Sequence, residues 1–125
     1  MLHKIVLLAI AGAIGTLSRY GLAGLVQRIN SPSFPFGTMA VNIGGCFVFG
    51  LLCSIFENRW SVSGETRVVI LVGFMGAFTT FSSFIFETGE LFRSAEWFRA
   101  SANLIAQNGL GLFALFLGTT LGRLD

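Results

Sequence analysis

The sequence has few charged residues. Lysine, arginine, aspartate and glutamate make up 11% of its 125 residues, whereas a soluble domain usually has about a quarter. Hydrophobic residues make up 54%, and the mean hydropathy is +0.78. A soluble chain of this length has too little interior to bury so much apolar surface. The shortage of charge therefore excludes an ordinary soluble domain and indicates that much of the surface faces lipid.

Residues that bind metals or catalyse reactions are also scarce. The single histidine, His3, is terminal, and Cys46 and Cys53 lie in one apolar run, about two helical turns apart. That separation is too long for a disulfide within one helix, so we interpret both as packing thiols. The sequence has no nucleotide-binding loop, no nucleophile paired with a base, and no basic run long enough for nucleic acid. These absences argue against an enzyme and against a nucleic-acid-binding protein.

Long apolar runs dominate what remains. Charged residues are absent from 29–56, 68–86 and 100–122, and between Lys4 and Arg28 only Arg19 is charged. A membrane-spanning helix needs about 20 apolar residues, and these runs lack the alternating polarity of barrel strands. We therefore expect an all-α membrane protein, a single domain over 1–125 with four transmembrane helices at about 4–28, 36–57, 66–93 and 97–123. The first run could be a cleaved signal peptide, but it continues past Arg19, and we interpret it as a retained helix.

Basic residues are divided almost evenly between the two sides of such a bundle. One side has four and the other three: Lys4, Arg59, Arg67 and Arg123 against Arg28, Arg93 and Arg99. Orientation normally follows an excess of basic residues on the cytoplasmic side. The near balance allows insertion in both orientations, although other features could fix a single one. Four helices are too few to enclose a pore, so we expect a homodimer, which can be antiparallel.

Polar residues within membrane spans are costly and are candidates for function. Arg19 either extends to the far interface or provides a fixed charge that attracts an anion. Asn42 either joins two helices or binds an anion through its amide. Asn103 and Gln107 share a helix face, which either lines a water-filled path or holds helices together. The candidate carboxylate is Glu87, which lies at the end of the third span rather than at mid-depth.

The third run contains GFMGAFTTFSSFIFE, from Gly73 to Glu87. Its glycines and hydroxyl residues favour a helix broken at mid-span near 76–80, although an unbroken helix with hydroxyls bonded to its own carbonyls is the alternative. A break frees carbonyl groups for a cation such as Na⁺, and amide and hydroxyl groups for an anion. Phe81 and Phe84 share a face, where ring edges either offer a weakly positive rim to an anion or simply pack.

This motif resembles that of the Fluc or CrcB family of small fluoride channels. GxxGxxTTFSxF followed by glutamate is the most specific part, and GxxSRY at Gly15 to Tyr20 and GTMAVNIGG at Gly37 to Gly45 extend the resemblance along the chain. The resemblance implies antiparallel, dual-topology homodimers with two fluoride pathways. It also implies a multi-pass protein of the cell inner membrane that lowers cytoplasmic fluoride by passive F⁻ efflux.

The resemblance also implies roles for individual residues. Phe81 and Phe84 match the aromatic pair along the ion path, Asn42 matches the pore asparagine, and Arg19 matches the vestibule cation. Thr80, Ser82 and Ser83 match the positions whose hydroxyl groups assist the passage of fluoride.

A structural Na⁺ at the dimer interface is implied as well, with the backbone carbonyls of Gly76 and Thr79 as its ligands. The fourth helix departs from the family pattern, in which a tyrosine and a serine face the pore. By position, Asn103 and Gln107 replace them on the ion path, and amides can donate hydrogen bonds to an anion.

Two other functions compete with this interpretation. A small multidrug exporter is also a four-helix dual-topology dimer, but it needs a carboxylate in the first helix, where this chain has Arg19. A non-transporting assembly protein predicts dimer stability that does not depend on ions, whereas the channel predicts stabilisation by Na⁺.

Overall fold

A computed structural model describes residues 1–124, and every regular element in that range is helical. The elements are α1 (Leu2–Ile29), α2 (Phe36–Asn58), α3 (Gly64–Arg67), η1 (Val68–Met75), α4 (Gly76–Phe78), α5 (Phe81–Arg93) and α6 (Trp97–Arg123). Four stretches are long and apolar enough to cross a membrane: α1, α2, the run Gly64–Arg93 and α6. The third stretch consists of α3, η1, α4 and α5 in succession. The predicted all-helical fold with four spans is therefore confirmed.

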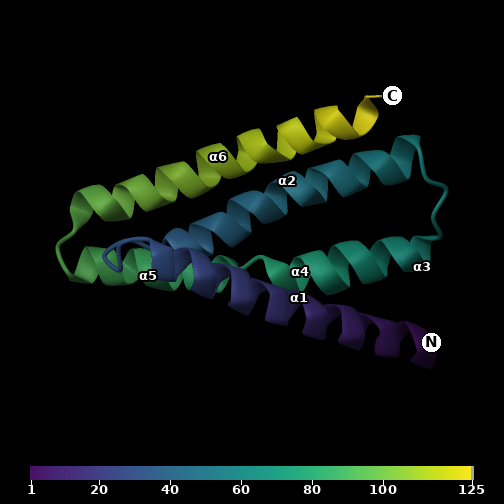
Figure 1. Cartoon of the computed structure of the whole chain (residues 1–125), viewed down its shortest axis with the longest axis horizontal. Helices are drawn as coiled ribbons and strands as arrows, with labels where there is room; N and C mark the ends of the chain where they lie inside the picture. Colours follow the sequence, from purple (N-terminus) through teal and green to yellow (C-terminus); the bar gives the residue numbers. More distant parts are fainter. Residues whose placement is uncertain (125) are drawn as a thin grey trace.

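The four spans run back and forth alongside one another (Figure 1). The N-terminus, the α2–α3 connection and the end of α6 lie at one end of the bundle, and the other two connections lie at the opposite end. Helix α6 packs along α2, α1 packs against η1, α4 and α2, and α5 packs against α6. The third span therefore packs against α1 through η1 and α4, and against α6 through α5.

Glycines allow α2 and α6 to approach closely. A Cβ atom on Gly118 would lie 2.1 Å from the carbonyl oxygen of Phe47, and one on Gly50 would lie 2.3 Å from that of Leu115. Both distances are well below van der Waals contact, so a side chain at either position requires the helices to separate. The two helices are therefore in close backbone contact at these glycines.

Helix α1 has the least buried surface of the four spans. Gly15 is its one buried residue, and a Cβ atom there would lie 2.4 Å from the carbonyl oxygen of Phe74 in η1. Most of its large apolar side chains are exposed, among them Ile5, Ile10 and Leu17. In a membrane this surface faces lipid or another protein chain.

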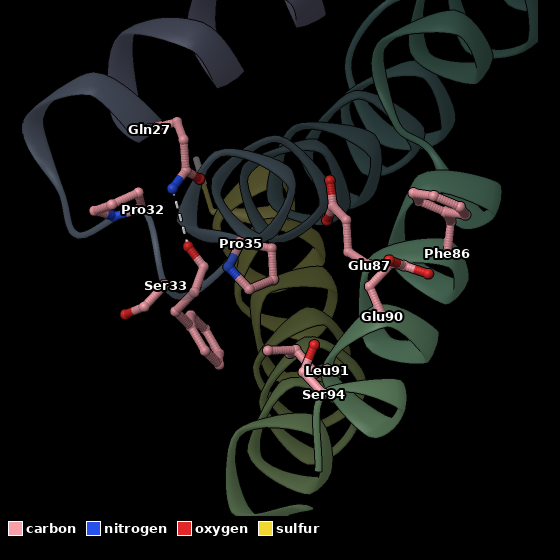
Figure 2. A pocket seen from close by; sticks show the side chains of 10 residues that line it. Gln27, Pro32, Ser33, Pro35, Phe86, Glu87, Glu90, Leu91 and Ser94 are labelled. Carbon is pink, nitrogen blue, oxygen red and sulfur yellow. Dashed lines mark hydrogen bonds between the residues drawn. The ribbon is translucent and has the colours of Figure 1, made fainter. Parts of the chain in front are cut away.

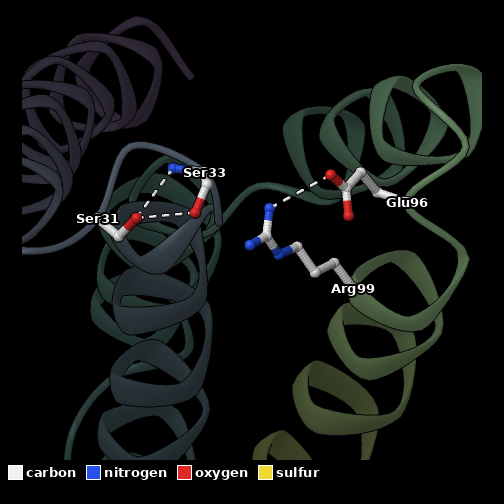
Figure 3. Close-up of polar contacts among 4 residues, drawn as sticks. All are labelled: Ser31, Ser33, Glu96 and Arg99. Carbon is white, nitrogen blue, oxygen red and sulfur yellow. Dashed lines mark hydrogen bonds and ion pairs between the residues drawn. The ribbon is translucent and has the colours of Figure 1, made fainter.

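Local polar contacts lie at the two connections at the end remote from the termini (Figure 3). Between α1 and α2, the hydroxyl oxygens of Ser31 and Ser33 are 2.7 Å apart. Just before and within the start of α6, Glu96 and Arg99 form an ion pair of 3.5 Å. These short connections leave no room for a further domain between the spans.

Candidate functional site

Two residues inside the third span have extended rather than helical backbone. Thr79 has φ −91° and ψ 161°, and Thr80 has φ −148° and ψ 118°. Helix α4 ends just before them and α5 begins just after them. The preceding η1 is a π-helix, a rare form that often occurs at functional sites. Peptide groups at such a point need hydrogen-bond partners outside their own helix.

Asn42 of α2 provides these partners for Thr80. Its Oδ1 accepts a hydrogen bond from the Thr80 N–H at 2.8 Å, and its Nδ2 donates to the Thr80 carbonyl at 2.9 Å. The same Nδ2 also donates to Oε1 of Gln107 at 2.8 Å. The donors of the Asn42 amide are thus engaged within the protein.

The hydrogen bonds continue from Gln107 into the interior. Gln107 Nε2 donates to Oδ1 of Asn103 at 2.9 Å, and Asn103 Nδ2 donates to the hydroxyl of Thr88 at 2.8 Å. Thr88 in turn donates to the carbonyl of Phe84 at 2.7 Å. Asn103 is completely buried, and Gln107 and Thr88 retain 7% and 3% of their accessible surface. The structure thus joins the three predicted amides and adds Thr88, which the sequence analysis missed although it follows Phe84 by one helical turn.

Arg19 of α1 contacts the third span from the opposite side. Its Nε donates to the carbonyl of Ala77 at 3.0 Å. In an uninterrupted helix that carbonyl would accept from the amide of Phe81. A cation at the C-terminal end of a helix is also favoured by the helix dipole. The half-buried Arg19 therefore satisfies a carbonyl that the extended segment leaves without its helical partner.

Two further carbonyl groups at this point have no such partner. Those of Gly76 and Thr79 accept none of the hydrogen bonds described for the segment, whereas the carbonyl of Met75 accepts from both the N–H and the hydroxyl of Thr79. Gly76 is exposed on the surface of the protomer. Within residues 1–124, no cluster of histidine, cysteine and acidic side chains could hold a metal. The backbone oxygens of Gly76 and Thr79 are therefore candidate cation ligands in this region.

The predicted hydroxyl residues gather at the start of α5. Thr80 caps the helix, since its Oγ1 accepts from the Ser83 N–H at 3.2 Å. The same oxygen donates to the Ser83 hydroxyl at 3.0 Å and lies 3.5 Å from that of Ser82. Ser82 is exposed on the protomer surface. These groups can offer hydrogen-bond donors to a ligand beside the extended segment.

Phe81 and Phe84 lie next to this cluster with their rings edge to face. The ring centroids are 6.0 Å apart, and the ring planes make an angle of 67°. Phe84 is 5% exposed, whereas Phe81 is 74% exposed. Both rings line a cavity of about 380 Å³, whose walls also include Asn42, Gly45, Cys46, Phe49, Thr79, Thr80 and Leu115. The cavity therefore joins the aromatic pair to the extended segment and to Asn42.

Glu87 lies further along α5, away from the extended segment and toward the α1–α2 connection. Its Oε1 accepts a hydrogen bond from Thr38 of α2 at 2.7 Å, and its Oε2 is buried without a partner. It lines a second cavity, in which Gln27 and Pro35 stand on one side and Glu87 and Glu90 on the other (Figure 2). The structure thus separates this carboxylate from the hydroxyl cluster at the start of α5.

Comparison with known proteins identifies the family. The profile described as CrcB-like protein, Camphor Resistance (CrcB), matches residues 6–119. A protein of Desulforapulum autotrophicum named fluoride-specific ion channel FluC is 62% identical over 124 residues, which is 99% of each chain. Relatives of the same name are 51% identical in Nitrosococcus oceani, over 99% of each chain, and 42% identical in Dehalococcoides mccartyi, over 97% of this chain and 93% of the relative. The four apolar spans, the extended segment in the third and this match along nearly the whole length show that the chain belongs to the CrcB family.

Proposed function

We propose that this chain forms a fluoride-selective ion channel that lowers cytoplasmic fluoride by passive F⁻ efflux across the cell inner membrane. The relatives named as fluoride-specific ion channels, which align along the whole chain, support this function. The structural observation that carries it is the extended backbone of Thr79 and Thr80 inside a membrane span. Irregular backbone at that depth is tolerated only where protein buries it or where it lines a water-filled cavity.

Selectivity for fluoride requires donors that replace its tightly held water. The path runs past the hydroxyls of Ser82 and Ser83 and the rings of Phe81 and Phe84, whose edges carry partial positive charge. Binding must be strong enough for the ion to enter and weak enough for it to leave. Ring edges and single hydroxyls meet this requirement better than a fixed lysine or arginine would.

The active form we propose is an antiparallel homodimer with two pathways. The nearly equal numbers of basic residues on the two sides support insertion in both orientations. Phe81 is 74% exposed in one protomer, and a second copy would enclose that ring and complete the walls of the path. The exposed apolar surface of α1 also leaves room for protein contact.

The same dimer would hold a structural Na⁺ at its centre. The carbonyl oxygens of Gly76 and Thr79 fit this ion because they lack hydrogen-bond partners and because hard cations prefer oxygen ligands. One protomer offers too few such oxygens to surround the ion, so the partner copy would supply the others. The cation would neutralise carbonyl dipoles at the extended segment and hold the two copies together.

Fluoride efflux from liposomes tests the proposed function. Purified protein is reconstituted in vesicles loaded with potassium fluoride, and release is followed with a fluoride electrode after valinomycin is added. We expect rapid fluoride release and negligible release from matched vesicles loaded with chloride. Equal permeation of the two halides, or fluoride release no faster than from protein-free vesicles, would refute the proposal.

A small multidrug exporter is the second candidate, and one observation favours it. Glu87 is a half-buried carboxylate within a span, with one oxygen that has no partner, as a proton-coupled carrier requires. Against it, α1 contains no acidic residue, and Arg19 lies in that helix. Uptake of a fluorescent organic cation into acid-loaded vesicles, abolished by Glu87→Gln, would favour the exporter.

A further inference from the structure

The buried side chains between α2, α5 and α6 form hydrogen bonds that all run in one direction. Because Thr88 donates to the carbonyl of Phe84 at 2.7 Å, its hydroxyl is left to accept, and it accepts from Nδ2 of Asn103 at 2.8 Å. That contact turns Oδ1 of Asn103 toward Nε2 of Gln107, and Oε1 of Gln107 then faces Nδ2 of Asn42. The orientation of the Thr88 hydroxyl therefore favours, through Asn103 and Gln107, the same orientation of the Asn42 amide that the Thr80 backbone requires.

Both ends of this chain of hydrogen bonds lie on the same helix. One end is the carbonyl of Phe84 in the first turn of α5, and the other is the peptide backbone of Thr80, which caps that helix. Thr80, Phe84 and Thr88 are spaced four residues apart and so share a face. The amides of α2 and α6 thus hold the extended segment and the start of α5 in one register.

Burial limits the access of an ion to these residues. Asn103 is completely buried, and Gln107 is 7% exposed. The amide oxygen of each accepts a hydrogen bond and the amide nitrogen of each donates one within the protein. An anion at Gln107 could bind only the one N–H of Nε2 that is not engaged, and that group belongs to a side chain that is 7% exposed.

We infer that Thr88, Asn103 and Gln107 are positioning residues, which fix the amide orientation of Asn42 and hold Thr80 in register with Phe84 without contacting the transported ion. The inference rests on the proposed fluoride path and assigns Thr88 a role in it. If the Asn42 amide were reversed, its Nδ2 would face the N–H of Thr80, and two donors would oppose each other. The aligned hydrogen bonds prevent that reversal and keep Phe84 at a fixed place beside Phe81.

Three variants at two threonines test the inference. Thr88→Val keeps the shape of the side chain but removes both of its hydrogen bonds, and Thr88→Ser keeps the hydroxyl. Thr120→Val is the matched control, because the hydroxyl of Thr120 also donates to the carbonyl one turn earlier, at 2.9 Å, but is exposed and makes no other hydrogen bond within residues 1–124. Each variant is compared with the unmodified protein by fluoride efflux, by the ratio of fluoride to chloride permeation, and by its elution volume in detergent.

We expect Thr88→Val to lower fluoride efflux by about tenfold, since a buried amide donor loses its acceptor, and to lower the fluoride-to-chloride ratio. Thr88→Ser and Thr120→Val should match the unmodified protein, and all should elute at the same volume. If Thr88→Val lowered only the thermal stability and left efflux and selectivity unchanged, the inference would be overturned. A loss of selectivity in Gln107→Leu without any loss in Thr88→Val would also overturn it, because Gln107 would then act on the ion directly.

Hydrogen–deuterium exchange separates this inference from the proposed function. Peptides that cover 79–88 should exchange faster in Thr88→Val than in Thr120→Val, because the Thr80 N–H loses its fixed acceptor. If the unmodified protein conducted no fluoride and this difference were still observed, the positioning of Thr80 would stand and the fluoride channel would fail. Equal exchange in the two variants would overturn the positioning role whatever the efflux result.

Discussion

The side chain of Asn42 pairs with the backbone of Thr80, although the two residues lie 38 positions apart and in different membrane spans. The amide accepts from the Thr80 N–H at 2.8 Å and donates to the Thr80 carbonyl at 2.9 Å. These two bonds replace those that an uninterrupted helix would have made at Thr80. The extended segment is therefore stable in the third span because a residue of the second span completes its hydrogen bonding.

Asn42→Leu should destabilise the protein and abolish fluoride efflux. Leucine is close in size but leaves the Thr80 N–H and carbonyl without partners, at a cost of about 1–3 kcal/mol for each group. The measurement is the thermal unfolding midpoint in detergent together with efflux from vesicles. Asn108→Leu is the control, because Asn108 is exposed and donates only to the carbonyl of Leu104 in its own helix. Equal losses in the two variants would show that the pairing with Thr80 is unimportant.

Phe81→Ile should block fluoride efflux while the protein still assembles. Isoleucine is apolar and fills similar space, but it has no ring edge with partial positive charge. Efflux and elution volume are measured together, so that loss of conduction is distinguished from loss of assembly. Phe113→Ile on α6 is the control, since this ring is also largely exposed and lines none of the cavities described above. Unchanged efflux in Phe81→Ile would remove this ring from the ion path.

Sodium should raise the thermal unfolding midpoint of the purified protein. A ligand that binds only the folded dimer stabilises it by about 2.7 kcal/mol at a concentration of one hundred times its dissociation constant. Melting curves are recorded in sodium, potassium and choline chloride at one ionic strength. We expect an increase with sodium concentration that potassium and choline do not reproduce. Identical curves in the three salts would contradict the proposed site at Gly76 and Thr79.

Gly118→Ala should destabilise the α2–α6 pair. The new methyl group would lie 2.1 Å from the carbonyl oxygen of Phe47, which belongs to the backbone and cannot turn aside. Overpacking of this kind costs about 1–3 kcal/mol. Gly109→Ala on the same helix is the control, because the added carbon would point into open space, and alanine is the better helix former. The unfolding midpoint should therefore fall in the first variant and stay level or rise in the second.

The four spans could be predicted because lipid imposes a simple requirement on sequence. A helix that crosses it must be long and nearly free of charge, and the charge-free runs mark such segments directly. The pairing of Asn103 with Gln107 could be anticipated for a similar reason, since residues four apart on a helix are neighbours. Both predictions depend only on local spacing along the chain.

The contacts that complete the candidate site depend on how different helices are placed. Arg19 reaches the carbonyl of Ala77, 58 positions away, and Asn103 reaches Thr88 across the connection between α5 and α6. Thr88 itself resembles any threonine that bonds back to its own helix, as Thr120 does. The sequence does not distinguish Thr88 from Thr120, because the additional partner of Thr88 is Asn103, which belongs to a different helix.

The order of the spans along the chain has a consequence for how the protein enters the membrane. A ribosome makes Asn42 before Thr80, so the second span is already synthesised when the extended segment emerges. The peptide group of Thr80, which would be costly to leave bare in lipid, therefore has a partner available from the outset. Gln107 is synthesised last, and its hydrogen bond to Asn42 adds to the pairing of Asn42 with Thr80 that the two earlier spans can already form.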